Sequence, residues 1–363
     1  MVETRHDLKR DKRLVEALAR VAPGTPLRDG IDNIIRAKTG ALIILGDQRE
    51  ISFLFSGGIR LDMEFSPNML YELAKMDGAT ILNRGVTRIH RANVQLMPDA
   101  AIESQETGTR HRTAERVARQ TSALAISISQ DRDVVSLYVG DIKYALTDIR
   151  VLLGKANQAL QTLDQYRTRL DKVTDNLTAL EFEDSVTLHD VIGVLQRSEV
   201  VARVAGEIDG YLLELGVEGR LVAMQLEELM SGVMKDRQAL IRDYLPRRKQ
   251  SVDRAAERIT AATTDELFDP VELAALLGYD RKAKAADTRM TPRGYRVLNS
   301  IPRLPSAVIG NIVEKFGTLK ALMVADEDDL VAVEGVGRVR ATEIGEGLAL
   351  LKEHAFAEKY SFR

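Results

Sequence analysis

The sequence predicts a chain of several domains: an α/β domain with a mixed central sheet, a helical middle domain, and a second all-helical domain. The chain has 363 residues, which is too many for a single hydrophobic core. Its first part alternates short apolar runs with amphipathic helical periods, a pattern typical of α/β domains. Past about residue 150 the strand patterns stop and helical periods continue. We place the three domains at 1–148, 149–288 and 289–363.

Short apolar runs in the first domain predict buried strands, the last two forming a hairpin around "QDRD". Ser66 is placed to cap a helix that has Pro67 in its first turn and ends near Gly78. The predicted helices cover 12–22, 29–37, 66–78 and 113–122, and the predicted strands cover 40–46, 51–58, 79–83, 88–97, 122–129 and 134–139.

The middle domain is predicted from apolar residues that recur four and three positions apart. This spacing places them along one seam of a long helix, which suits a local bundle, a spacer or a dimerisation element. More helices are expected through 187–285, with breaks near Gly206, Gly216 and Pro246. The seam consists of Leu152, Ala156, Ala159, Leu163, Tyr166, Leu170, Val173, Leu177 and Leu180.

The last domain uses one unit twice, in "IPRLPSAVIGNIVEKFG" and "LVAVEGVGRVRATEIGEG". Each unit is a short helix, a tight turn and a second helix, so we interpret the pair as a tandem helix-hairpin-helix domain. Gly335 and Gly337 let the second turn approach a phosphate, towards which the amides of the next helix point. A dinucleotide-binding fingerprint is excluded, because Arg340 occupies its third glycine position and a helix precedes the motif.

Contacts of this kind bind a nucleic-acid backbone without reading its sequence. The first copy departs from the pattern, since Arg303 and Pro305 stand where glycines are expected and Pro305 has no amide to donate. We therefore expect the second hairpin to make most of the phosphate contacts. The basic run 246–249 either extends this track or is a solvated helix end. The predicted DNA-contacting residues are Arg303, Gly335, Val336, Gly337, Arg338 and Arg340.

The composition narrows the classes of function. Formal net charge is −3, so any contact with nucleic acid must be local. The absence of cysteine excludes disulfides, zinc–cysteine sites and thiol nucleophiles. The first residues lack an apolar signal core, and the apolar runs are too short to span a bilayer. We expect a cytoplasmic protein with no membrane partner.

The stretch "TGTRHRTAER" at 107–116 concentrates positive charge where a helix is predicted to begin. Gly108 permits a turn, and Thr113 is placed to cap the helix over 113–122. Arg110 and Arg112 flank His111, so an extended turn would let them hold different oxygens of a polyphosphate. The alternative interpretation is a solvated basic helix start. No Walker A motif is present in the chain.

A second candidate element is "KMDGA", in which Asp77 stands where a helix ends and a strand begins. A carboxylate at such an edge can hold a divalent metal beside a hydroxyl group. The alternative is an ordinary Asp-Gly turn after a helix.

The order and separation of "GALIILG", "SGG", "KMDGA", "GTRHRTAER" and "ALAISIS" resemble those of the diadenylate cyclase domain family. With the helical middle and the tandem helix-hairpin-helix end, the whole chain is similar to the DNA integrity scanning family of bacterial diadenylate cyclases. The Asp-Gly-Ala and Arg-His-Arg motifs carry this resemblance together. The chain has Gln130 where wider relatives often carry Glu after the strand serine.

The resemblance implies roles for individual residues. Asp77 would bind Mg²⁺ or Mn²⁺ and help to activate the 3′-hydroxyl of ATP. Catalysis would depend on Asp77, Arg110, His111 and Arg112. The residues implied to bind ATP or the cyclic product are Gly78, Leu96, Thr109, Arg110, His111, Arg112, Thr113 and Ser129. For Leu96 and Ser129 the alternative is an ordinary place in the core or strand.

The resemblance also implies a nucleotidyltransferase that joins two ATP molecules into cyclic di-AMP with release of two pyrophosphates. The product has two-fold symmetry, which suits two half-sites facing each other across a two-fold axis. The family forms an octamer through its cyclase domains. DNA, in particular branched DNA, would modulate synthesis through the last domain, and the protein would be associated with the nucleoid.

Two other classes of function stay open on the residues alone. One is an architectural DNA-binding protein whose α/β domain senses nucleotide. The other is a structure-specific nuclease, since helix-hairpin-helix pairs often accompany nucleases, although no acidic cluster typical of two-metal catalysis stands out.

Overall fold

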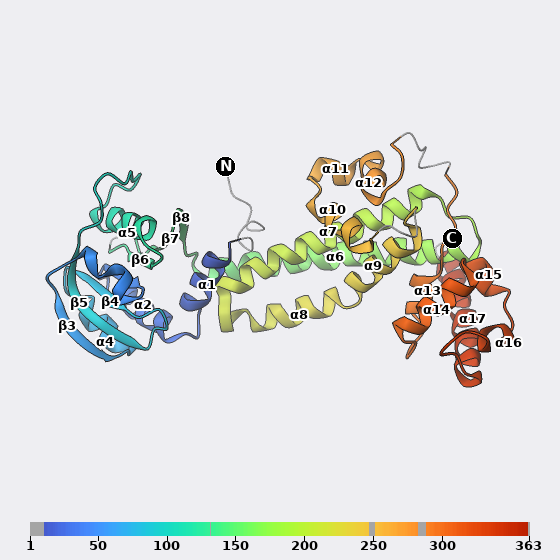
Figure 1. Ribbon diagram of the computed structural model, residues 1–363, viewed down its shortest axis with the longest axis horizontal. Coiled ribbons are helices and arrows are strands. Elements are labelled where there is room, and N and C mark those ends of the chain that lie inside the picture. Colours follow the sequence, from blue (N-terminus) through green and yellow to red (C-terminus); the bar gives the residue numbers. More distant parts are fainter. Residues whose placement is uncertain (1–10, 131, 247–250, 282–287, 362–363) are drawn as a thin grey trace. The chain divides into compact units, whose positions relative to one another are not determined.

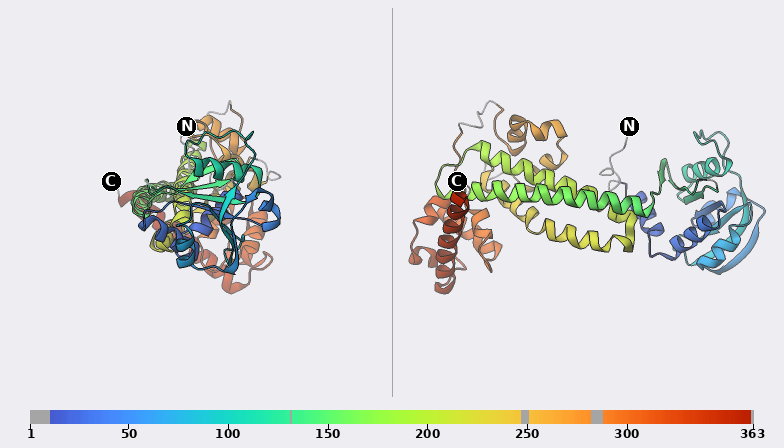
Figure 2. Two further views of the ribbon diagram at one scale, coloured as in Figure 1. Left: turned by 90° about the vertical axis from the view of Figure 1, so that its left-hand side faces the viewer. Right: turned by 180° about the vertical axis from the view of Figure 1, so that it is seen from behind.

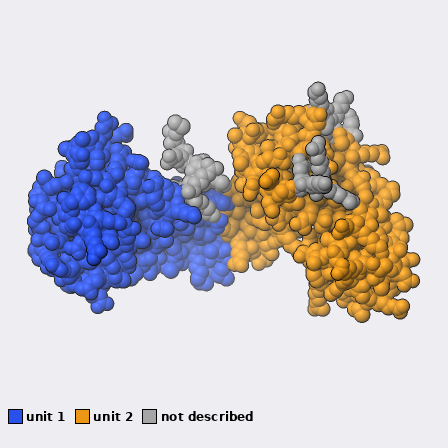
Figure 3. All heavy atoms as spheres, viewed as in Figure 1, with its two compact units in different colours: residues 1–160, 206–225 blue, residues 161–205, 226–363 orange. Residues whose placement is uncertain are grey.

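The computed structural model describes residues 11–130, 132–246, 251–281 and 288–361 (Figure 1). The chain divides into two compact units (Figure 3). Unit 1 consists of 1–160 and 206–225, and unit 2 consists of 161–205 and 226–363. Helical residues 149–160 and 206–225 thus belong to the same compact unit as the α/β domain.

An eight-stranded mixed sheet forms the centre of unit 1. The central strand β1 (Ala41–Leu45) is parallel to β4 (Ala79–Leu82) and antiparallel to β6 (Leu124–Ile128). The strand order is β2-β5-β4-β1-β6-β7-β8, and β3 also pairs with β5. The remaining strands are β2 (Phe55–Ser56), β3 (Ile59–Glu64), β5 (Arg88–Leu96), β7 (Val135–Val139) and β8 (Ile142–Ala145). The prediction of an α/β domain with a mixed sheet is confirmed.

Helices cover both faces of this sheet (Figures 1 and 2). α1 (Lys12–Val21), α2 (Pro26–Arg36) and α4 (Pro67–Leu73) share one hydrophobic core with alternate residues of β1. α5 (Thr109–Gln120) shares the other core with the intervening residues Leu42 and Ile44. β1 is apolar at every position because both its faces are buried.

Several predicted elements differ from the structure. The segment 51–58 is not one strand: α3 (Gln48–Ile51) and the 3₁₀ turn η2 (Ser52–Leu54) precede β2. The helix after Ser66 ends at Leu73, short of Gly78, although Ser66 does cap it, its Oγ accepting from the Met69 N–H at 3.2 Å.

The largest difference concerns α5, which begins at Thr109. Gly108 is its N-cap and Thr113 lies inside the helix, so the prediction that Thr113 caps it is wrong. The hydroxyl of Thr113 suits a cap, but no side chain makes the capping hydrogen bond here. The Arg-His-Arg motif therefore lies in a helical turn and not in an extended one.

The helical middle of the chain is confirmed as helical, with the predicted seam on α6 (Ile149–Phe182). Every seam residue is buried or half-buried. Gly206 does not interrupt α7 (Leu188–Leu215), whereas Gly216 begins the 3₁₀ turn η3 (Gly216–Gly219) with φ of +52°. The following helices are α8 (Arg220–Met230), α9 (Val233–Tyr244), α10 (Val252–Ala261), α11 (Thr264–Phe268) and α12 (Pro270–Leu277).

The C-terminal part of unit 2 has two helix–turn–helix units around one apolar core. The first consists of α13 (Tyr295–Asn299) and α14 (Ser306–Phe316), and the second of α16 (Glu327–Val331) and α17 (Arg338–Ser361). α15 (Leu319–Met323) connects them. The repeated helical units predicted from the sequence are therefore present.

A buried polar network joins α13 to α6 and α9 within unit 2. The Arg296 guanidinium forms an ion pair with Glu181 and donates to Thr178 Oγ1 at 2.9 Å. The Tyr244 hydroxyl donates to Glu181 at 2.7 Å. Asp243 accepts hydrogen bonds at 2.7–2.8 Å from the first amides of α13, including that of Arg296. Because these groups are buried, moving α13 away from the long helices would leave buried charges unpaired.

Candidate functional site

A cavity of about 870 Å³ lies at one edge of the sheet in unit 1. It is formed by the ends of β1, β2, β4, β5 and β6, the turns before β3 and β4, and the first turns of α5. The lining residues are Leu42, Ser56, Gly57, Gly58, Asp77, Gly78, Ala79, Asn93, Val94, Gln95, Leu96, Gly108, Thr109, Arg110, His111, Thr113, Ser129 and Gln130.

The cavity brings together nearly all of the nucleotide-site residues expected from the sequence. The two motifs meet there, although Asp77 and Arg110 are far apart in the chain. Arg112 is not among the lining residues. Its guanidinium instead donates to the backbone carbonyls of Glu106 at 3.3 Å and Thr107 at 3.1 Å. The expected residues that line the cavity are Asp77, Gly78, Leu96, Thr109, Arg110, His111, Thr113 and Ser129.

The start of α5 gives the cavity an anion-attracting wall. Gly108 precedes the helix and no side chain caps its amides. Amides at a helix start without intrahelical partners bind anions well, and the helix dipole adds to this effect. The first turn contains no acidic residue, so nothing in it opposes an anionic ligand.

Arg110 approaches the backbone of Gly40 just before β1. A Cβ atom built on Gly40 would overlap the Arg110 guanidinium and lie 2.8 Å from its Cζ. Gly40 therefore leaves the space that the arginine side chain occupies. In the sequence, Gly40 only begins a predicted strand and the motif "GALIILG", and nothing local links it to Arg110.

Gly78 is required by a close backbone approach to β5. A Cβ atom at Gly78 would lie 2.6 Å from Asn93 Cα. The backbone N–H of Gly78 donates to Asn93 Oδ1 at 3.1 Å. Asn93 has a φ of +54°, a conformation that asparagine adopts more readily than most residues. Asn93 is not predicted as a site residue, and the only sequence signal for it is an asparagine inside the mixed polar and apolar strand β5.

Arginines of α5 also hold the preceding loop in place. Arg116 donates to the carbonyls of Ile102 at 2.8 Å and Ala100 at 3.1 Å, and Arg119 donates to that of Glu103 at 2.6 Å. Several arginines of α5 thus donate hydrogen bonds to loop carbonyls, while Arg110 and His111 face the cavity.

Behind His111, a chain of hydrogen bonds leads away from the cavity. His111 Nδ1 lies 3.0 Å from the Tyr138 hydroxyl, which donates to Glu106 Oε1 at 3.0 Å. Lys143 forms an ion pair with Glu106. Burial raises the pKa of Glu106, but Lys143 and Tyr138 outweigh it, so the pKa lies below its usual value. For His111, in contrast, burial lowers the pKa, which favours the neutral ring.

The cavity offers a divalent metal one carboxylate, that of Asp77. Among the described residues, no three His, Cys, Asp or Glu side chains gather to hold a metal ion. Mg²⁺ commonly binds through one or two carboxylates and the phosphates of its substrate. The residues present therefore fit a metal that arrives with a nucleotide, and not a cation bound by protein alone.

The second glycine turn of the C-terminal unit has the geometry expected for close approach. Gly335 has a φ of +84°, and a Cβ on Gly337 would meet no atom within 4 Å. Arg338 begins α17, and the Arg340 guanidinium donates to the Gly335 carbonyl. The Val336 side chain is buried in the core, so only its backbone could contact a ligand.

In the first turn, Arg303 also has positive φ, at +61°. A non-glycine residue in this conformation carries some strain. The basic run at 246–249 lies largely outside the described residues, since 247–250 are not described.

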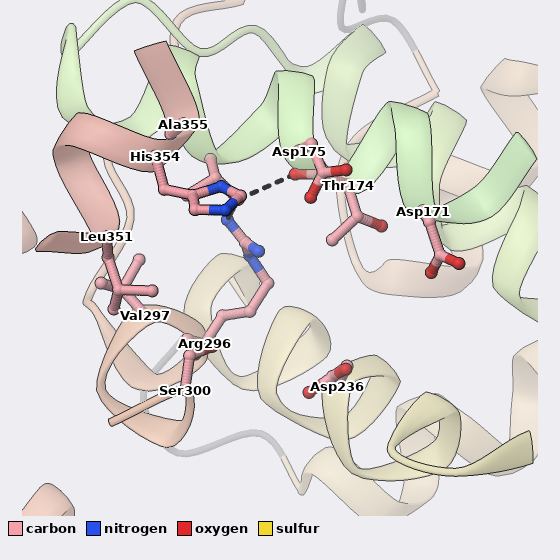
Figure 4. A pocket seen from close by; sticks show the side chains of 11 residues that line it. Asp171, Thr174, Asp175, Asp236, Arg296, Val297, Ser300, Leu351, His354 and Ala355 are labelled. Atoms are coloured by element: carbon pink, nitrogen blue, oxygen red, sulfur yellow. Dashed lines mark hydrogen bonds between the residues drawn. The ribbon is translucent and has the colours of Figure 1, made fainter. Parts of the chain in front are cut away.

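A second cavity, of about 250 Å³, lies within unit 2 between α6, α9, α13 and α17. Its wall includes Asp171, Asp175 and Asp236 opposite Arg296, and the His354 ring points toward Asp175 (Figure 4). Burial raises the pKa of Asp236. This cavity lies beside the ion pair that anchors α13, and the sequence analysis did not predict it.

Comparison with known proteins identifies two consecutive family domains in the chain. Residues 28–142 match the family described as DisA bacterial checkpoint controller nucleotide-binding. Residues 146–286 match the family described as DisA bacterial checkpoint controller linker region. The fold and site thus define a nucleotide-binding α/β domain followed by a helical linker.

Full-length relatives extend the match to nearly the whole chain. The DNA integrity scanning protein DisA of Kineococcus radiotolerans is 49% identical and covers 96% of this chain and 98% of its own. That of Carboxydothermus hydrogenoformans is 51% identical and covers 95% and 98%. The protein belongs to the DNA integrity scanning protein DisA family. Among the described residues, no helix is both long and apolar enough to cross a bilayer.

Proposed function

We propose that the protein is a diadenylate cyclase that condenses two ATP molecules into cyclic di-AMP and two pyrophosphates. The observation that carries this proposal is the single cavity that joins Asp77 and Gly78 to the uncapped start of α5 with Arg110 and His111. The family description of the domain as nucleotide-binding supports it.

The reaction forms two bonds and breaks two. The 3′-hydroxyl of each ATP gives up its proton to solvent and its oxygen attacks the α-phosphorus of the other ATP, from which pyrophosphate leaves. The α5 amides and Arg110 would hold the triphosphate and stabilise charge on the phosphoryl group in transfer. Asp77 would hold Mg²⁺ or Mn²⁺, which would neutralise phosphate charge when bound. Positioning of two nucleotides supplies much of the remaining acceleration.

One cavity of this kind accommodates one reacting half of the product. Each ATP is both nucleophile and electrophile, so two sites must face each other across a two-fold axis. We therefore propose a homo-oligomer, an octamer by resemblance to the family, in which cyclase domains of different subunits are paired.

We further propose that the C-terminal helix-hairpin-helix units bind DNA through its backbone and that DNA structure modulates synthesis. The left-handed Gly335, the open space at Gly337 and the basic start of α17 support this interpretation. The names of the relatives describe them as DNA integrity scanning proteins.

The deciding experiment incubates the full chain with ATP and Mg²⁺ or Mn²⁺, with and without branched DNA, and identifies the products by mass spectrometry. Cyclic di-AMP with two equivalents of pyrophosphate is the expected result. DNA binding without any cyclic product from an oligomeric sample would instead support an architectural protein that senses nucleotide.

A further inference from the structure

The hydrogen bonds behind His111 determine which of its ring nitrogens carries a proton. Glu106 is ionised, because its pKa lies below the usual range and Lys143 pairs with it. A carboxylate only accepts hydrogen bonds. The single phenolic proton of Tyr138 must therefore point to Glu106, 3.0 Å away.

The Tyr138 oxygen is then left as an acceptor toward His111 Nδ1, at 3.0 Å. Nδ1 must accordingly carry the proton, and the neutral ring has its lone pair on Nε2. Within the described part of the chain, Nε2 has no protein partner. His111 itself lines the cavity.

In this tautomer, the Nε2 atom that faces away from Tyr138 has no proton to donate to a phosphate oxygen. Phosphate oxygens that are fully ionised accept hydrogen bonds and cannot donate to a lone pair. Nε2 can bond such an oxygen only after it has gained a proton from solvent, which makes the ring an imidazolium with both nitrogens donating.

Several charged groups face His111 from the surrounding elements. Burial favours the neutral ring, as do Lys143 of β8, Arg110 of α5 and Arg132 of the β6–β7 loop. Glu106 acts in the opposite direction. A polyphosphate would add several negative charges on the cavity side, which shifts this balance toward the imidazolium.

We propose that Glu106 and Tyr138 are positioning residues that hold His111 in its Nδ1–H tautomer, so that binding of a nucleotide polyphosphate is coupled to protonation of Nε2. The proposal rests on the proposed function, since it requires a nucleotide in this cavity. It explains why a buried tyrosine and an ion pair lie behind the helix start. Neither Glu106 nor Tyr138 lines the cavity, so each would act on a bound nucleotide through His111.

The test is calorimetric titration of the full chain with Mg²⁺ and 3′-deoxy-ATP, which lacks the attacking hydroxyl. At about pH 8 the nucleotide phosphates are ionised, so any proton taken up goes to the protein. Titration in two buffers with different ionisation enthalpies gives the number of protons taken up. We expect about one proton per bound nucleotide, with affinity falling about tenfold per pH unit above neutrality.

Two variants distinguish the proposed control of the His111 tautomer by Glu106 and Tyr138 (the relay) from a role of these residues in packing alone. In Glu106→Gln, the amide can donate to the Tyr138 oxygen, so the phenolic proton turns to Nδ1 and Nε2 carries the ring proton. In Tyr138→Phe, Nδ1 loses its acceptor and the Nε2–H form becomes accessible. Both variants should bind nucleotide with little proton uptake and a flatter pH profile. Tyr144→Phe is the matched control, because its hydroxyl donates to Glu214 at 2.7 Å instead, and it should behave as wild type.

The outcomes test the tautomer proposal separately from the proposed cyclase activity. Nucleotide binding by the wild type without proton uptake would overturn the relay, as would undiminished uptake in both variants. A parallel assay for cyclic di-AMP tests the proposed function on the same samples. Failure to bind nucleotide at all would overturn both proposals.

Discussion

The guanidinium of Arg110, in the first turn of α5, occupies the space beside the Cα of Gly40, just before β1. The contact joins the first turn of α5 to the start of β1 at the cavity. It also depends on the absence of a side chain at Gly40, since any Cβ would overlap the guanidinium.

Gly40→Ala should therefore displace Arg110 while leaving the fold intact, because the overlapping atoms are the mobile end of a long side chain. We expect cyclic di-AMP synthesis to fall about ten- to a hundredfold, as for a phosphate-holding group moved by an ångström. Initial rates and KM for ATP measure this effect. Gly154→Ala on α6, where a Cβ meets no atom within 4 Å, is the control and should retain full activity.

Asp77→Asn should abolish synthesis without changing the thermal unfolding of the domain. The variant removes the one carboxylate that lines the cavity among the described residues, and loss of metal-assisted charge stabilisation costs about a thousandfold in rate or more. Asp141→Asn removes a carboxylate that is 93% exposed and should leave the rate unchanged. Substantial product from Asp77→Asn would exclude the metal role.

Gly337→Asp should weaken DNA binding without affecting ATP turnover in the absence of DNA. The new side chain has room, but its charge would face the phosphate that the turn is proposed to approach. We expect a loss of at least about tenfold in affinity, measured by fluorescence anisotropy at fixed salt. Pro305→Asp in the first turn should cost less, and the opposite order would show that the first hairpin makes the main contact.

Arg296→Met should destabilise unit 2, because it leaves Glu181 buried without its partner. The expected loss in free energy of unfolding is about 3–5 kcal/mol. The chain has no tryptophan, so circular dichroism during urea unfolding is the suitable measurement. Arg281→Met breaks an exposed pair with Glu272 and should cost no more than about 1 kcal/mol.

A double variant tests whether the unpaired charge of Glu181 causes this loss of stability. Replacing Glu181 with Leu in the Arg296→Met background removes the unpaired charge, so part of the lost stability should return. No recovery would mean that packing around Tyr244 and Thr178, and not the ion pair, holds α13 in place.

Local patterns were enough to predict most elements of the chain. Ser66 and Pro67 marked a helix start because capping and a fixed φ act within one turn. The apolar run of β1 marked a buried strand, and the seam on α6 marked a long helix. The resemblance to the diadenylate cyclase family, carried by the order of the motifs, placed Asp77 and Arg110 in one expected site, and the cavity contains both. The start of α5 was misplaced, since Thr113 suits a cap as well as Gly108 does.

What the sequence determined by itself is therefore the class of most segments and the chemistry of the two motifs. The tertiary structure decided which side chains of "TGTRHRTAER" face the cavity: Arg110 and His111 do, whereas Arg112 donates to loop carbonyls. It also decided that Gly40, Asn93 and Tyr138 support the site. The physical reason is that periodicity and capping are local, while these contacts join residues that only packing of the sheet and helices brings together.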